Sequence, residues 1–76
     1  MAKQDKLVNM LDRATDMVSD IGILRDELKK SGKYTKEANN DLKRQMIITK
    51  EMVLNEYWDY VLEITNMRWQ DLDFEE

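Results

Sequence analysis

Residues 46–69 read MIITKEMVLNEYWDYVLEITNMRW, and this stretch decides the fold. It holds most of the aromatic side chains and contains no glycine or proline. At about 100° per residue, its apolar positions cover roughly half of a helical cylinder, which is wider than the seam one partner helix needs. They follow two neighbouring lines, one with Met46, Val53, Tyr57, Tyr60 and Ile64, the other with Ile47, Leu54, Trp58 and Val61. Such a helix needs two or more neighbours.

The composition is that of a small helical protein. Proline is absent, glycine occurs twice, and charged residues make up 37% of the 76 residues, so we expect the all-α class. In a chain this short, apolar burial only roughly offsets an ordering entropy of about 1.5 kcal/mol per residue. Cysteine and histidine are both absent, which excludes disulfides and thiolate or imidazole metal sites. Oligomerisation is the remaining means of stabilisation.

A first helix is predicted over about residues 4–30. Its apolar residues fall into three adjacent stripes, namely Leu7/Ala14/Ile21/Leu28, Met10/Met17/Leu24 and Leu11/Val18. Three stripes suit a helix bundle better than a two-stranded coiled coil, which needs two. Gly22 interrupts this helix at a cost of about 1 kcal/mol relative to alanine. It either permits a close approach or lies on a solvent-facing side, and we favour the second.

A turn is predicted at residues 31–34. Lys29 and Lys30 complement the dipole of the first helix at its end, and Gly32 follows where a left-handed residue stops a helix. Thr35 is the predicted N-cap of the next helix. Because the connection is short, the two helices must be antiparallel neighbours.

A second helix is predicted over about residues 35–70. It would be about 53 Å long against about 40 Å for the first. Folding the chain at the turn pairs Leu24 with Leu42 and Leu11 with Tyr57. The start of the first helix then lies level with Ile64 of the second helix. Beyond that level, four apolar side chains of the second helix are uncovered: Met67, Trp69, Leu72 and Phe74. Exposed apolar surface of this extent usually marks a contact site.

The last third of the chain is strongly acidic. Residues 51–76 carry Arg68 against eight carboxylates, a net charge of −7 within a total of −4. Carboxylates at a helix C-terminus oppose the dipole, so residues 71–76 are predicted to form a frayed acidic tail. This tail is either a docking peptide that orders on a partner or a solubilising end, and the sequence leaves both open.

No enzyme chemistry is visible in the sequence. Catalytic triads and glycine-rich phosphate loops lack their residues, so we expect no catalytic residues, no cofactor and no metal. Glu56, Asp59 and Glu63 share one helical face, but it lies opposite the apolar arc, where solvated charges belong. Asp12, Asp16 and Asp20 form a second acidic row, read as a solvated face or, less favoured, as a docking strip for basic side chains.

Two alternatives involve nucleic acids. Seven basic and four acidic residues lie near the turn. If the chain forms a nucleic-acid-associated oligomer, the phosphate-binding residues would be Lys29, Lys30, Lys33 and Lys36. No element for reading bases accompanies them. Alternatively, the acidic end mimics a nucleic acid and inhibits a DNA- or RNA-handling enzyme.

The leading prediction is an antiparallel two-helix hairpin that self-associates. A dimeric four-helix bundle is favoured over a larger coiled-coil oligomer. The function expected is that of a non-enzymatic adaptor, assembly factor, or small regulator or inhibitor that also binds another protein. The residues expected to contact partners are Tyr57, Trp58, Trp69, Leu72 and Phe74. With no signal-peptide pattern and no apolar run of about eighteen residues, we expect a cytoplasmic protein without membrane contact.

Overall fold

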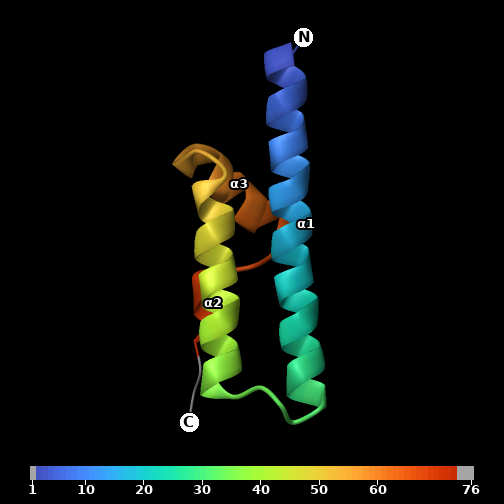
Figure 1. The fold of residues 1–76 in the computed structure, drawn as a ribbon, viewed down its shortest axis with the longest axis vertical. Helices are drawn as coiled ribbons and strands as arrows, with labels where there is room; N and C mark the ends of the chain where they lie inside the picture. Colours follow the sequence, from blue (N-terminus) through green and yellow to red (C-terminus); the bar gives the residue numbers. More distant parts are fainter. Residues whose placement is uncertain (1, 74–76) are drawn as a thin grey trace.

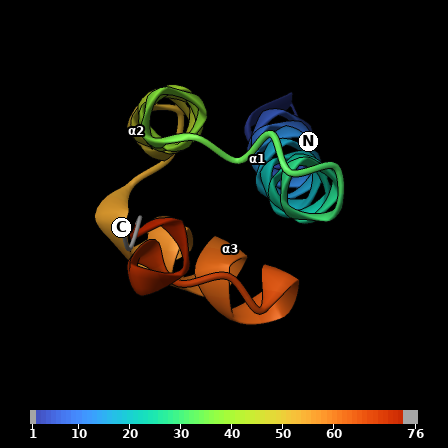
Figure 2. The ribbon, with the colours of Figure 1, turned by 90° about the horizontal axis from the view of Figure 1, so that it is seen from below.

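The computed structural model describes residues 2–73, and the side chains of residues 5–73. Three α-helices and a short 3₁₀-helix follow one another: α1 (Ala2–Lys30), α2 (Lys36–Glu51), α3 (Asn55–Thr65) and η1 (Trp69–Leu72). No strand occurs within the described residues, so the predicted all-α class is confirmed. α1 and α2 lie side by side and antiparallel (Figure 1), and α3 and η1 cover one face of this hairpin (Figure 2).

The turn between α1 and α2 is built from local hydrogen bonds. Gly32 adopts the left-handed region with φ 73°, and the Lys33 N–H donates to the Leu28 carbonyl at 2.9 Å. This pattern satisfies carbonyls that the end of a helix otherwise leaves without partners. On the other side of the turn, the Thr35 hydroxyl accepts from the Ala38 N–H at 3.1 Å and caps α2. The hairpin direction is therefore fixed within a few residues.

The expected single helix over residues 35–70 is wrong, because the chain breaks between α2 and α3. The Met52 N–H donates to the Thr49 carbonyl at 3.1 Å, a three-residue bond that tightens the last turn of α2. Leu54 is extended, with φ −69° and ψ 154°, and its carbonyl accepts from the Tyr57 and Trp58 N–H groups of α3, both at 2.9 Å. α3 then runs back beside α1 (Figure 1).

Burial explains why the helix breaks without a glycine or proline. Continuing the helix would keep about three backbone hydrogen bonds, each worth about 1 kcal/mol net. Folding back buries Trp58 and Val61, and it brings Met67 and Leu72 into the same core. Each large apolar side chain gains about 1.5–3 kcal/mol on burial, so the folded-back chain is the more stable arrangement.

The chain turns again after α3, at Asn66. This residue has φ 54° and ψ 33°, and the Met67 N–H donates to the Leu62 carbonyl at 3.1 Å. The hydrogen-bond pattern is the same as at Gly32, with asparagine in the left-handed position. The turn directs η1 against α2, where Leu72 is fully buried.

The core lies between the hairpin and the layer formed by α3 and η1. Its buried apolar residues are Ala14, Val18, Ile21, Leu42, Met46, Trp58, Val61, Met67 and Leu72. The predicted exposure of Met67 and Leu72 is therefore wrong, because the break lets both fold inward. The prediction that the second helix extends beyond the first is also wrong, since the first turns of α1 extend beyond α2 and α3 (Figure 1).

Candidate functional site

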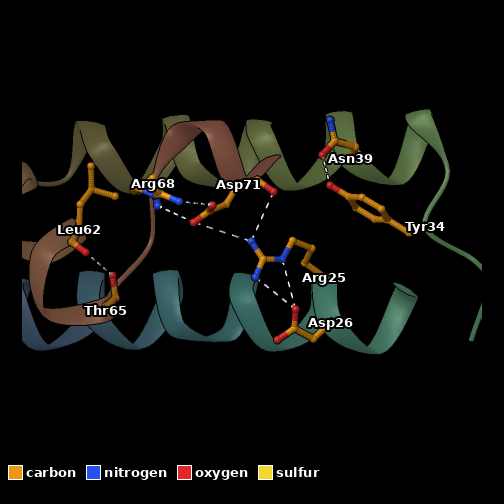
Figure 3. A network of polar contacts seen from close by, with 8 residues as sticks. All are labelled: Arg25, Asp26, Tyr34, Asn39, Leu62, Thr65, Arg68 and Asp71. Carbon is orange, nitrogen blue, oxygen red and sulfur yellow. Dashed lines mark hydrogen bonds and ion pairs between the residues drawn. The ribbon is translucent and has the colours of Figure 1, made fainter. Parts of the chain in front are cut away.

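A polar network holds η1 in place and is structural. Figure 3 shows the Arg25 guanidinium between Asp26 and Asp71, and Nη1 donates to the Asp71 carbonyl at 3.4 Å. The Asp71 carboxylate also accepts from the Arg68 N–H at 3.0 Å. The Asp73 carboxylate lies 3.5 Å from Lys43 Nζ on α2. The described part of the segment predicted as a tail is thus attached to the body of the molecule.

Tyr34, in the turn before α2, forms a second polar contact. Its hydroxyl donates to the side-chain carbonyl of the buried Asn39 (Figure 3), and Lys29 Nζ lies 5.5 Å from its ring centroid. Burial raises the pKa of Tyr34, the charge of Asp73 raises it further, and the Arg25 guanidinium opposes both effects. This contact anchors the turn to α2.

The cations near the turn are partly neutralised. Arg25, Lys43 and Arg44 form ion pairs with Asp26, Asp73 and Asp41 respectively. Of the four lysines predicted to bind phosphate, Lys29 stacks on Tyr34, while Lys30, Lys33 and Lys36 are exposed around the turn. Asp26 and Asp41 are already included in the count of seven basic against four acidic residues, whereas Asp73 comes from the acidic end of the chain. The local excess of positive charge is therefore smaller than the sequence suggests.

The open face of the α1–α2 hairpin is the first of three apolar surfaces. A groove of about 270 Å³ lies between the two helices and is lined by Met17, Asp20, Ile21, Leu24, Leu42 and Gln45. Leu24 is 45% exposed, and Met10, two helical turns before Met17, is also exposed. This is the predicted Met10/Met17/Leu24 stripe, and α3 and η1 lie on the other side of the hairpin (Figure 2).

A second surface lies where α1 meets the beginning of α3. A hollow of about 460 Å³ is lined by Leu11, Glu56, Tyr57 and Tyr60. Tyr60 and Ile64, one turn apart on α3, are 52% and 49% exposed. Sequence reasoning selected Tyr57 but missed these two neighbours, because it assigned them to the interior of a straight helix.

A third surface lies between α3 and η1. Its hollow of about 450 Å³ is lined by apolar side chains of Leu62, Met67 and Trp69 together with the polar residues Asp59, Glu63, Asn66, Arg68 and Gln70. Trp69 is 42% exposed here. The acidic row Glu56, Asp59 and Glu63 therefore runs along α3 between the second and third surfaces.

The predicted partner residues separate into different environments. Tyr57 and Trp69 lie at surface hollows, whereas Trp58 and Leu72 are buried in the core and so do not form part of an exposed surface. Phe74 lies outside the described residues. Asn66 is a local signal for the second turn, because asparagine adopts the left-handed conformation more readily than most residues with a side chain.

Comparisons with models of protein families, with curated proteins and with solved structures found no match.

The part of the chain that the structure describes contains no group of three or more carboxylates arranged to hold a metal ion. Within the same residues, none of the helices combines the length and the apolar character that crossing a bilayer requires. Every buried side-chain nitrogen and oxygen in this part of the chain has a hydrogen-bond partner. The apolar surfaces are consequently the features that call for a functional explanation.

Proposed function

We propose that this chain is a non-enzymatic protein–protein interaction module that self-associates through the open face of the α1–α2 hairpin. The observation that carries the proposal is the groove between the two helices, with Leu24 at its edge and Leu42 and Ile21 in its floor. A domain this small gains much from covering such a face. Adaptors, assembly factors and small regulators or inhibitors are the functional classes that this architecture suits.

A dimer covers the open face most economically. Two copies related by a twofold axis place the same face against itself, so each groove receives exposed side chains of the other copy. The hairpins then form a four-helix bundle, with α3 and η1 as outer layers on both sides. Met10, Met17 and Leu24 recur every seven residues along α1, which is the spacing that helices in bundles use for contact. A larger ring is the second choice for the assembly.

The nucleic-acid alternatives receive less support from the contacts. Three cations near the turn already have acidic partners, which reduces the charge available for phosphates. Asp71 and Asp73, part of the acidic end that a nucleic-acid mimic would use, are likewise paired with basic residues. The expected cytoplasmic location stays a prediction.

Two neighbouring residues provide a matched test of the proposed interface. Leu24 lies on the groove and is 45% exposed, whereas Ile23 is 57% exposed and lines a hollow between α1 and the end of α3. Leu24→Lys places a charge in the proposed interface, and Ile23→Lys places the same charge on another side of the helix. Sedimentation velocity should find the first variant as a monomer and the second as a dimer. Equal behaviour of the two variants contradicts the assignment of the interface to this face.

A further inference from the structure

A strip of apolar side chains runs along the junction of α1 and α3, on a different side from the proposed dimer interface. The hollow lined by Leu11, Tyr57 and Tyr60 forms its centre. Val8 extends the strip along the overhanging part of α1, and Ile64 extends it along α3, both about half exposed. Since α3 packs on α1 over this length, the strip is one surface formed by two helices.

Carboxylates border this strip on both sides. On α3, Glu56 lines the hollow itself, and Glu63 follows two turns later on the same side of the helix. On α1, Asp12 lies one turn after Val8. All three residues are exposed.

The charges along the strip have no partners within the described part of the chain. None of the three carboxylates takes part in an ion pair there, although Asp26, Asp41, Asp71 and Asp73 all do. α3 itself contains three acidic residues and no basic residue. The strip is therefore an apolar surface bordered by negative charges. The resulting negative potential attracts a positively charged partner and repels a negatively charged one.

We propose that this strip binds a positively charged amphipathic α-helix of another protein. This inference rests on the proposed function as a protein-binding module, and it adds the chemical class of the partner. The distance along α3 from Tyr57 to Ile64 is seven residues, or about 10.5 Å, which matches two turns of a docked helix. Apolar residues at positions i, i+3 or i+4, and i+7 of the ligand meet the strip, and lysines or arginines beside them face the carboxylates.

The backbone of the strip also selects a helical ligand. Every residue that forms it belongs to α1 or α3, so the strip contains no strand edge. An extended peptide finds no free strand edge to pair with, whereas a helical ligand satisfies its own backbone. The two acidic borders further require the basic residues to flank the apolar face on both sides, as they do in a basic amphipathic helix.

The test uses the full chain and three synthetic peptides of eighteen residues. The first has leucines on one helical face and lysines elsewhere, the second has glutamate in place of lysine, and the third has the composition of the first in a scrambled order. Isothermal titration calorimetry should show binding of the first peptide, weakened by salt, and at least about tenfold weaker binding of the other two. Equal binding of all three, or of none, overturns the inference.

Two pairs of substitutions locate the binding site. Tyr60→Ser with Ile64→Ser should weaken binding of the lysine peptide by about tenfold or more, because few contacts carry most of the affinity. Ile47→Ser with Ile48→Ser removes two similarly exposed side chains from α2 and should change the affinity by less than about twofold. Glu56→Gln with Glu63→Gln should reduce the salt dependence. If binding follows the α2 pair instead, the strip is not the site.

The outcomes separate this inference from the proposed function. If the lysine peptide does not bind while Leu24→Lys still dissociates the dimer, the inference fails and the proposed function stands. If Tyr60→Ser with Ile64→Ser dissociates the dimer, the strip is covered by a second copy, which overturns the inference and moves the interface. Circular dichroism of each variant, with the helical signal unchanged, shows that a loss of binding is not a loss of fold.

Discussion

A Cβ atom built on Gly22 would lie 3.1 Å from the Met67 sulfur, so the segment after α3 contacts α1 where α1 has no side chain. The expectation that Gly22 faces solvent is therefore wrong. The close approach lets Met67 enter the core and directs the chain onward to η1. Two surface hollows border Met67, so its flexible side chain has space into which it can move.

Gly22→Ala should stabilise the protein. Alanine gains up to about 1 kcal/mol of helix propensity over glycine, and the Met67 sulfur needs to shift by only a few tenths of an ångström. Gly22→Val adds further methyl groups against Met67 and should lower the free energy of unfolding by about 1–3 kcal/mol. Urea unfolding measures both changes. A loss of stability in the alanine variant means that Met67 is held rigidly.

Both left-handed turns should be more stable with glycine than with a residue that carries a Cβ atom. Gly32 and Asn66 both have positive φ angles. A Cβ atom in this conformation costs about 1–2 kcal/mol, so Gly32→Ala should lower the stability by about 1 kcal/mol. Asn66→Gly should raise it by about 0.5–1 kcal/mol, since glycine adopts this conformation without strain. Thermal unfolding of the two variants checks the signs, and a destabilised Asn66→Gly contradicts the account of the second turn.

The two tryptophans should differ in their fluorescence and in their contribution to the free energy of unfolding. Trp58 is 6% exposed and Trp69 is 42% exposed. In the Trp69→Phe variant the remaining emission should be shifted to the blue and protected from iodide, and in Trp58→Phe it should be quenched readily. Trp58→Ala should cost about 3–5 kcal/mol, whereas Trp69→Ala should cost less than about 1 kcal/mol in a monomer. Similar quenching of both single-tryptophan variants contradicts the folded-back arrangement of α3.

Stability should fall at alkaline pH in part because of Tyr34. Burial raises the pKa of this phenol above its ordinary value of 10.0. The unfolded chain then loses the proton at a lower pH than the folded chain, so the stabilisation is complete below about pH 10 and declines as the pH rises through the folded pKa. Urea unfolding between pH 8 and 11 should show a shallower decline for Tyr34→Phe. Parallel declines of the two proteins remove Tyr34 as the cause.

The sequence predicts the first half of the fold well, because the deciding interactions there are local. Gly32, the preceding lysines and Thr35 indicate the turn at the place where the structure has it. The pairing of Leu24 with Leu42 agrees with the groove that both residues line. Leu11 and Tyr57 share a hollow as well, but Tyr57 reaches it from α3 and not from the predicted second helix of a hairpin. The stripe pattern of α1 correctly indicated more than one neighbouring helix.

The second half was not predictable from local signals. Residues 52–54 contain neither glycine nor proline, and the chain breaks there because a third helix can cover the core. That gain depends on contacts between residues about 45 positions apart, such as Gly22 and Met67, which periodicity does not reveal. Asn66 was the one local indication of a turn. The error in the second helix placed Met67, Leu72 and Trp58 on the wrong side of the boundary between core and surface.

The mass of the unmodified chain in solution tests the central claim, which is association through the open hairpin face, most directly. Sedimentation equilibrium over a range of micromolar concentrations should give about twice the 9.1 kDa of one chain, with the mass falling toward the single-chain value on dilution. A mass of one chain at every concentration would contradict that claim.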